Sequence, residues 1–202
     1  MSKRMPLTDA VATVRAARAD TDIVISSMGT AREWMALGPL HPLDFVYVPS
    51  AMGHAAALGL GLALAQPARR VIALMGDGSL LMNLGSLATI AAERPPNLVV
   101  IVFDNGVYEV TGAQPTPATV GVDESRVDYV AVARACGIRS VHAFSDSMEW
   151  SSGITGVLEA QGPTVVVLGV ASVPGVGGPK SPGPTSQRGP AFMAALTERT
   201  AS

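Results

Sequence analysis

Two short loops in the middle of the chain carry residue types that bind a divalent cation. Gly76-Asp77-Gly78 and Asp104-Asn105-Gly106 each directly follow a run of apolar residues. Asp77 offers a carboxylate oxygen and Asn105 an amide oxygen, and the glycine after Asn105 lets the main-chain carbonyl of Val107 face the same point. Three oxygen ligands of this kind suit Mg²⁺, which completes an octahedron with phosphate oxygens and water.

The glycines around Asp77 also favour an anion. Gly76 and Gly78 leave main-chain N–H groups free where a helix from Ser79 to Glu93 is expected to begin. This helix would join strands 70–75 and 97–103 in a right-handed crossover, so the two loops should follow strands that lie close together, at the ligand-binding edge of a sheet. A lone Gly-Asp-Gly is a common turn, but two such loops at this spacing predict a magnesium diphosphate site.

Short β-branched runs alternate with longer runs rich in Ala, Leu and Gly, which is typical of an α/β fold: a doubly wound, mostly parallel sheet with helices on both faces. The pattern predicts strands at 22–27, 44–48, 70–75, 97–103, 140–144 (an edge strand) and 163–169. It predicts helices at 8–20, at 31–37 after a turn at Gly29, and at 51–65, 79–93, 127–136 and 146–161.

The composition changes after residue 171. Residues 1–171 are expected to form one domain, and residues 172–202 an arm with a C-terminal helix at 191–198. Residues 172–190 are rich in Pro and Gly, which predicts irregular structure. The segment is either a flexible linker or an extended arm that packs over a site or a partner subunit.

Composition excludes several classes of protein. The net charge of -2 provides no basic field for nucleic acid and no polybasic arm for a membrane surface. The longest apolar stretch, 51–65, is too short to span a bilayer. The single Cys allows no internal disulfide, and no signal-peptide pattern is present, so we expect a cytoplasmic protein. The charged fraction of 15% suggests either a surface covered by another chain or simply an Ala-rich composition.

The two loops, separated by 25 residues, resemble the cofactor motif of thiamine-diphosphate-dependent enzymes. Asp104 stands where the family usually has Asn. The resemblance implies the family's diphosphate-binding domain, in which Asp77, Asn105 and the carbonyl of Val107 bind Mg²⁺ and the metal binds the diphosphate. Asp104 is not at a ligand position of this motif.

A second resemblance lies upstream, where Pro49-Ser50-Ala51-Met52-Gly53 is similar to the family's Gly-Ser-(bulky apolar)-Gly loop. It implies that Met52 is the apolar wedge that keeps the two cofactor rings bent, and that the carbonyl of Ser50 meets the 4′-amino group, although the family prefers Gly there. His54 is either a helix-start residue or a substrate contact, and Tyr108 either touches the diphosphate or only walls the site. The cofactor contacts implied are Gly29, Ser50, Met52, Gly76, Gly78, Ser79 and Tyr108.

Further segments resemble the sulfopyruvate and phosphonopyruvate decarboxylases of this family, among them 28–33, 50–54, 104–109, 111–116 and 188–196. The resemblance implies the diphosphate-binding subunit of an enzyme that decarboxylates a small anionic 2-oxo acid. The activating Glu would lie on a pyrimidine-binding alpha subunit, in an α₂β₂ or larger assembly. A carboligase resembling acetolactate synthase, a 2-oxo acid oxidoreductase subunit and a non-catalytic cofactor-binding module remain as alternatives.

Overall fold

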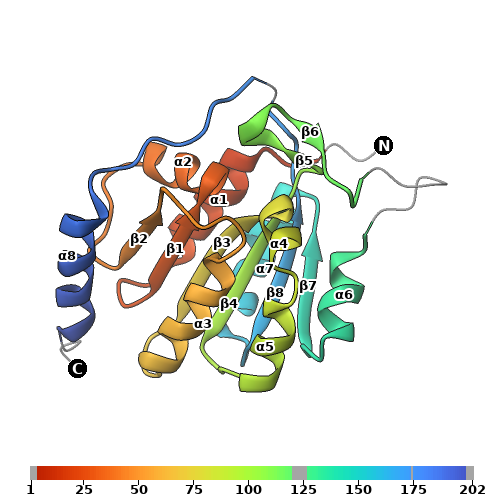
Figure 1. The fold of residues 1–202 in the computed structure, drawn as a ribbon. Coiled ribbons are helices and arrows are strands. Elements are labelled where there is room, and N and C mark those ends of the chain that lie inside the picture. Colours follow the sequence, from red (N-terminus) through yellow and green to blue (C-terminus); the bar gives the residue numbers. More distant parts are fainter. Residues whose placement is uncertain (1–3, 120–126, 174, 199–202) are drawn as a thin grey trace.

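The computed structural model describes residues 4–119, 127–173 and 175–198. Its centre is a six-stranded parallel sheet in the order β2-β1-β3-β4-β8-β7 (Figure 1). β7 forms one edge of the sheet, as predicted for residues 140–144, and β2 forms the other. The strands are β1 (Ile23–Ser27), β2 (Asp44–Tyr47), β3 (Val71–Gly76), β4 (Leu98–Asp104), β7 (Ser140–Phe144) and β8 (Thr164–Gly169).

Helices cover both faces of this sheet, which confirms the predicted doubly wound α/β class. α1 (Leu7–Ala17), α2 (Met28–Ala36) and α7 (Ser147–Glu159) pack on one face. The other face is covered by α3 (Ala55–Ala65), α4 (Asp77–Met82), α5 (Ser86–Glu93) and α6 (Tyr129–Ala135), with α8 (Thr185–Thr197) beside β2. None of the helices in the described part of the chain is long and apolar enough to cross a membrane.

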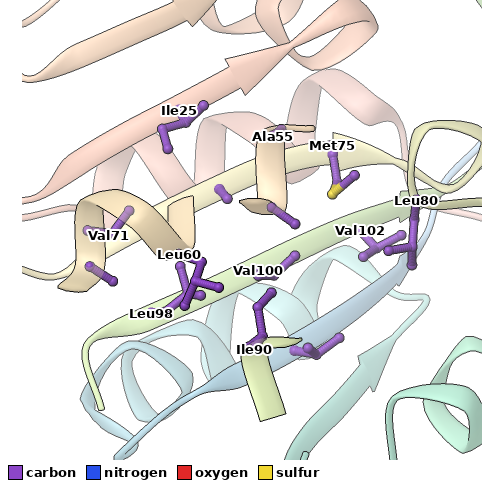
Figure 2. Close-up of a cluster of buried hydrophobic side chains, with 14 of the residues drawn as sticks. Ile25, Ala55, Leu60, Val71, Met75, Leu80, Ile90, Leu98, Val100 and Val102 are labelled. Atoms are coloured by element: carbon purple, nitrogen blue, oxygen red, sulfur yellow. The ribbon is translucent and has the colours of Figure 1, made fainter. Parts of the chain in front are cut away.

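The central strands are buried on both sides, and their side chains alternate between two cores. On β3, Val71, Ala73 and Met75 belong to the core under α3 and α5, part of which Figure 2 shows. Ile72 and Leu74 belong to the opposite core, under α1 and α7. This two-residue period explains why the central strands read as continuous apolar runs rather than as alternating ones.

The predicted crossover is confirmed, because β3 and β4 are parallel neighbours with Gly76 paired to Phe103. From β1 the chain continues to β2, toward one edge of the sheet, and from β3 it continues to β4, toward the opposite edge. The order of the strands therefore reverses between β1 and β3, and such a point is where open α/β sheets bind ligands, beyond the carboxyl ends of the strands.

The prediction of one crossover helix from Ser79 to Glu93 is wrong. Two helices, α4 and α5, occupy this stretch, and α4 already begins at Asp77. They are separated at Asn83, whose φ and ψ of -144° and 49° are not helical. Asn is a poor helix former, and its side chain competes for main-chain hydrogen bonds, so the helix ends there.

Two other helix starts were misplaced. The helix expected at 51–65 begins only at Ala55, because the chain turns at Gly53, where φ is +90°. The helix after β1 begins at Met28 rather than Ala31. The left-handed residue of that junction is Met28 itself, with φ of 52°, while the predicted turn residue Gly29 lies in the first helical turn.

The C-terminal region is more ordered than its composition predicted. α8 begins at Thr185, within the segment expected to be irregular, and contains Pro190. Arg188 of this helix donates hydrogen bonds to the carbonyls of Val46 and Val48 at 2.8 and 2.9 Å and lies over the ring of Phe45. These contacts explain why a Pro-containing segment stays helical. Pro174 and residues 199–202 of the predicted arm lie outside the described residues.

A small antiparallel hairpin beside the sheet was not predicted. β5 (Val107–Tyr108) pairs with β6 (Gln114–Pro115), and the short 3₁₀ helix η1 (Glu109–Thr111) lies between them. Strands of two residues show no periodicity in the sequence, so no pattern could reveal them.

Candidate active site

A cavity of about 240 Å³ lies at the carboxyl ends of the central strands. Its walls come from residues 28–30 after β1, 76–79 after β3 and 107–111 after β4, with Leu7 and Val170 added from distant parts of the chain. The fold therefore brings both predicted ligand loops to one cavity, although 28 positions separate Asp77 from Asn105.

Asp77 sits at the first turn of α4 and is 1% exposed. Its Oδ2 accepts a hydrogen bond from the main-chain N–H of Gly106 at 3.1 Å, which ties the two ligand loops together. Burial, with a smaller contribution from the negative charge of Asp104, raises the pKa of Asp77 from 3.8 to about 6. No Lys or Arg of the described residues forms an ion pair with Asp77, so its charge is left for a cation to neutralise.

The second ligand loop is held in shape by its own hydrogen bonds. Asn105 Oδ1 accepts from the N–H of Val107 at 3.0 Å, across Gly106, whose φ is 76°. The carbonyl of Gly106 accepts from Thr119 Oγ1 and from the N–H of Thr116, at 2.8 and 3.0 Å. The amide oxygen of Asn105 has a second lone pair for a metal.

This donor set fits Mg²⁺ better than a transition metal. Within the described ranges, no group of three or more His, Cys, Asp or Glu residues could hold a metal ion. The predicted ligands are instead one carboxylate, one amide and one carbonyl oxygen, which are hard ligands. The ligand assignment for Asp77, Asn105 and Val107 itself stays a prediction.

The predicted diphosphate side of the cavity is built around Gly78. A Cβ at this position would lie 2.6 Å from the ring of Tyr108, so the ring packs directly on the glycine. Ser79 Oγ accepts from the N–H of Gly53 at 3.1 Å and so links α4 to the loop that carries Met52. Five predicted cofactor contacts line the cavity: Gly29, Gly76, Gly78, Ser79 and Tyr108. Their contact with a cofactor stays a prediction.

The three residues of the Met52 loop that were considered as cofactor or substrate contacts differ in their positions relative to the cavity. Met52 lines the cavity and is 48% exposed, and its role as an apolar wedge stays a prediction. Ser50 and His54 are not among the lining residues. Ser50 Oγ instead contacts Met28 Sδ at 3.3 Å, and His54 is an exposed residue at the N-cap of α3. Cofactor or substrate contact by these two residues stays a prediction.

Several cavity residues were missed by sequence reasoning. Met28 and Met82 add apolar walls, and Leu7 reaches the cavity from α1. The acid Glu109 is 8% exposed and lines the cavity too. The sequence places Glu109 only two residues after the predicted ligand Val107, and this proximity could have indicated that Glu109 lies at the cavity. No feature of the sequence indicates that Leu7 or Met82 does.

Comparison with known proteins gives the same assignment as the site. Residues 22–168 match the family model of the "thiamine pyrophosphate enzyme, C-terminal TPP binding domain", in which thiamine pyrophosphate is another name for thiamine diphosphate. A phosphonopyruvate decarboxylase of Streptomyces viridochromogenes is 45% identical over 77% of this chain and 38% of its own length. The sulfopyruvate decarboxylase subunit beta of Methanothermobacter thermautotrophicus is 39% identical over 67% of this chain and 68% of its own length.

Solved structures agree with the sequence relatives. The thiamine diphosphate-dependent 4-hydroxybenzoylformate decarboxylase of Rhodococcus jostii superposes with a TM-score of 0.71 at 25% identity, over 86% of this chain and 34% of that one. The chain thus spans 38% of the phosphonopyruvate decarboxylase and about a third of the solved enzyme, but about two thirds of the separate beta subunit. Residues 22–168 place the chain in the family of thiamine pyrophosphate enzymes, as their C-terminal TPP-binding domain.

Proposed function

We propose that this chain is the diphosphate-binding subunit of a cytoplasmic, thiamine-diphosphate- and Mg²⁺-dependent decarboxylase of a small anionic 2-oxo acid such as sulfopyruvate or phosphonopyruvate. The observation that carries the proposal is the buried carboxylate of Asp77, which no Lys or Arg of the described ranges neutralises and which a hydrogen bond ties to the loop of Asn105 within one cavity. The names of the two decarboxylase relatives support the substrate class.

In this proposal Asp77, Asn105 and the carbonyl of Val107 hold Mg²⁺, and residues 76–79 with Gly29 receive the diphosphate. Met52 supports the rings from the other wall of the cavity. Once bound, the cofactor supplies the carbon nucleophile and the electron sink that decarboxylation of a 2-oxo acid needs. In this proposal the residues of this chain orient the bound cofactor and place the metal and its ligands around the diphosphate, but they do not donate a proton in the reaction.

The cavity would present a mostly apolar surface to the bound cofactor. Met28, Met52, Met82, Phe103 and Val107 give it a largely apolar lining. An apolar wall strengthens electrostatic interactions inside the site and slows side reactions of a reactive intermediate with water.

Activation of the cofactor requires a carboxylate on the pyrimidine ring, which this chain is not proposed to supply. The two acids that line the cavity have other roles: Asp77 is assigned to the metal, and Glu109 pairs with Arg32. We therefore propose that a pyrimidine-binding alpha subunit completes the site in an α₂β₂ or larger assembly. The relative that this chain covers by 68% is itself called subunit beta, which supports this arrangement.

The test is reconstitution with a candidate alpha subunit. The two proteins are mixed with thiamine diphosphate and Mg²⁺, and CO₂ release is measured with sulfopyruvate, phosphonopyruvate and pyruvate. Asp77→Ala should abolish release, whereas Asp20→Ala, which removes an exposed carboxylate, should not. Cofactor binding without CO₂ release would refute the decarboxylase, and a condensed product would identify a carboligase.

A further inference from the structure

Glu109 joins three segments that are far apart in the sequence. It begins η1, directly after the β5 residues Val107 and Tyr108. Its Oε1 accepts a hydrogen bond from the main-chain N–H of Val173 at 2.8 Å, and its Oε2 pairs with Arg32 Nη2 at 3.2 Å. Both carboxylate oxygens are therefore engaged at the wall of the cavity.

Arg32 extends this connection to the Pro/Gly-rich arm, defined here as residues 175–184. While Nη2 binds Glu109, Nη1 donates to the carbonyl of Gly177 at 3.3 Å, and Nε binds Glu33 Oε1 at 2.9 Å. A planar guanidinium holds several acceptors in fixed directions, which suits it to join separate segments. In Figure 1 the blue arm passes the end of α2 and the hairpin on its way to α8.

Close packing accompanies these hydrogen bonds. A Cβ on Gly178 of the arm would lie 2.9 Å from Val110 Cγ1 on η1, so the arm runs directly along the short helix. A Cβ on Gly29 would lie 3.4 Å from Glu109 Oε2, which places the carboxylate against the first turn of α2. The three segments thus meet without a gap around one acid.

The hairpin that carries Val107 needs such an external support. β5 and β6 pair over only two residues each, and a two-stranded ladder of this kind is marginal in water. On the side of Asn105 the loop is held by Gly106, through Asp77 and Thr119. On the side of η1, Glu109 binds the main-chain N–H of Val173, just before the arm, and the guanidinium of Arg32 on α2.

We propose that Glu109 is a positioning residue: together with Arg32, Val173 and Gly177 it forms a clasp that fixes η1 and, through it, the Val107 carbonyl and the Tyr108 ring. The arm then becomes a part of the site rather than a linker. The clasp is a feature of the chain alone, and only its effect on the metal rests on the proposed function.

The first test measures amide hydrogen exchange by mass spectrometry in the full chain without cofactor. Glu109→Ala should speed exchange in peptide 105–112 and in the arm by about tenfold or more, the effect of losing a charged hydrogen bond. Glu109→Gln keeps an acceptor for Val173 but loses the ion pair, so its effect should be smaller. Glu149→Gln removes an exposed acid of α7 and should change neither segment.

Arg32→Met supplies the coupling test. If the two side chains act as one clasp, peptide 105–112 of the double variant Glu109→Ala/Arg32→Met should exchange no faster than the same peptide of Glu109→Ala alone. Unchanged exchange in 105–112, or an equal increase throughout the sheet, would overturn the proposal. Fully additive effects of the two substitutions would also overturn it.

The second test uses the assembled enzyme and separates positioning from chemistry. Glu109→Gln should raise the Mg²⁺ concentration needed for half-maximal activity by several-fold while leaving kcat at saturating Mg²⁺ within about twofold of the wild-type value. A loss of kcat at unchanged Mg²⁺ demand would show that Glu109 acts on the reaction itself and refute the positioning role. If the wild type showed no Mg²⁺-dependent activity, the proposed function would fail while the exchange result stood.

Discussion

Replacing Asp77 by Asn tests how much the buried charge of Asp77 destabilises the folded chain. The pKa of Asp77 rises from 3.8 to about 6 on folding, chiefly because the carboxylate is buried. The folded chain therefore binds this proton more tightly than the unfolded chain between these two values. The free energy of unfolding should consequently fall as pH rises through that window, in the absence of metal.

The size of the effect follows from the shift. A difference of slightly more than two pKa units corresponds to about 3 kcal/mol, reached in full above pH 7. Asn carries no charge, so the variant lacks this pH dependence. Well below pH 3.8 the carboxyl is neutral in both the folded and the unfolded chain, and the difference between wild type and variant then reflects only the hydrogen bonds made at position 77.

The assay is urea unfolding of the chain with EDTA, followed by circular dichroism between pH 4 and pH 7.5. Over this range the unfolding free energy of Asp77→Asn minus that of wild type should increase by about 2.5 kcal/mol, because a small part of the effect is already present at pH 4. The exposed Asp20→Asn serves as the control for a simple change of net charge. A difference that stays constant with pH would refute the buried-charge reasoning.

Three further outcomes are expected. Met52→Leu should retain most activity of the assembled enzyme and Met52→Ala should lose it, because only a large apolar side chain fills the wedge position; equal activity in a CO₂-release assay would contradict this. Gly78→Ala should weaken cofactor binding in a calorimetric titration, since its Cβ would come within 2.6 Å of the Tyr108 ring, and an unchanged affinity would show that the ring moves freely. The chain alone should release no CO₂ from 2-oxo acids, and turnover by a sample that mass spectrometry shows to be free of any partner would refute the two-subunit proposal.

The sheet could be predicted from the sequence because burial on both faces leaves a plain signal. β3 and β4 are apolar from end to end, and the glycine-flanked polar loop after each one marks its carboxyl end. The same logic brought Asp77 and Asn105 to one cavity, because parallel neighbours end at the same edge. These predictions depend on the chain's own pattern and needed no knowledge of side-chain packing.

What failed depends on local geometry or on distant contacts. The break at Asn83 and the left-handed Met28 are settled by main-chain angles that the residue types do not dictate. The helix at Thr185 persists because Arg188 binds carbonyls 140 and 142 positions away. Glu109 was visible as an acid near the loop, but its partners on α2 and beyond β8 could only be found in three dimensions.

The position of Arg188 has a consequence for the behaviour of the chain in crowded solution. Among the strands of the described residues β2 pairs only with β1, so its outer side is the kind of strand edge on which another polypeptide can add by main-chain hydrogen bonds. The guanidinium of Arg188 binds two carbonyls in this region, and the ring of Phe192 packs at a tilt against that of Phe45, with ring centroids 5.0 Å apart. The C-terminal helix thereby covers part of this edge, and we expect that a proteolytic nick that released the helix would leave the strand open to edge-to-edge association with another copy of the chain.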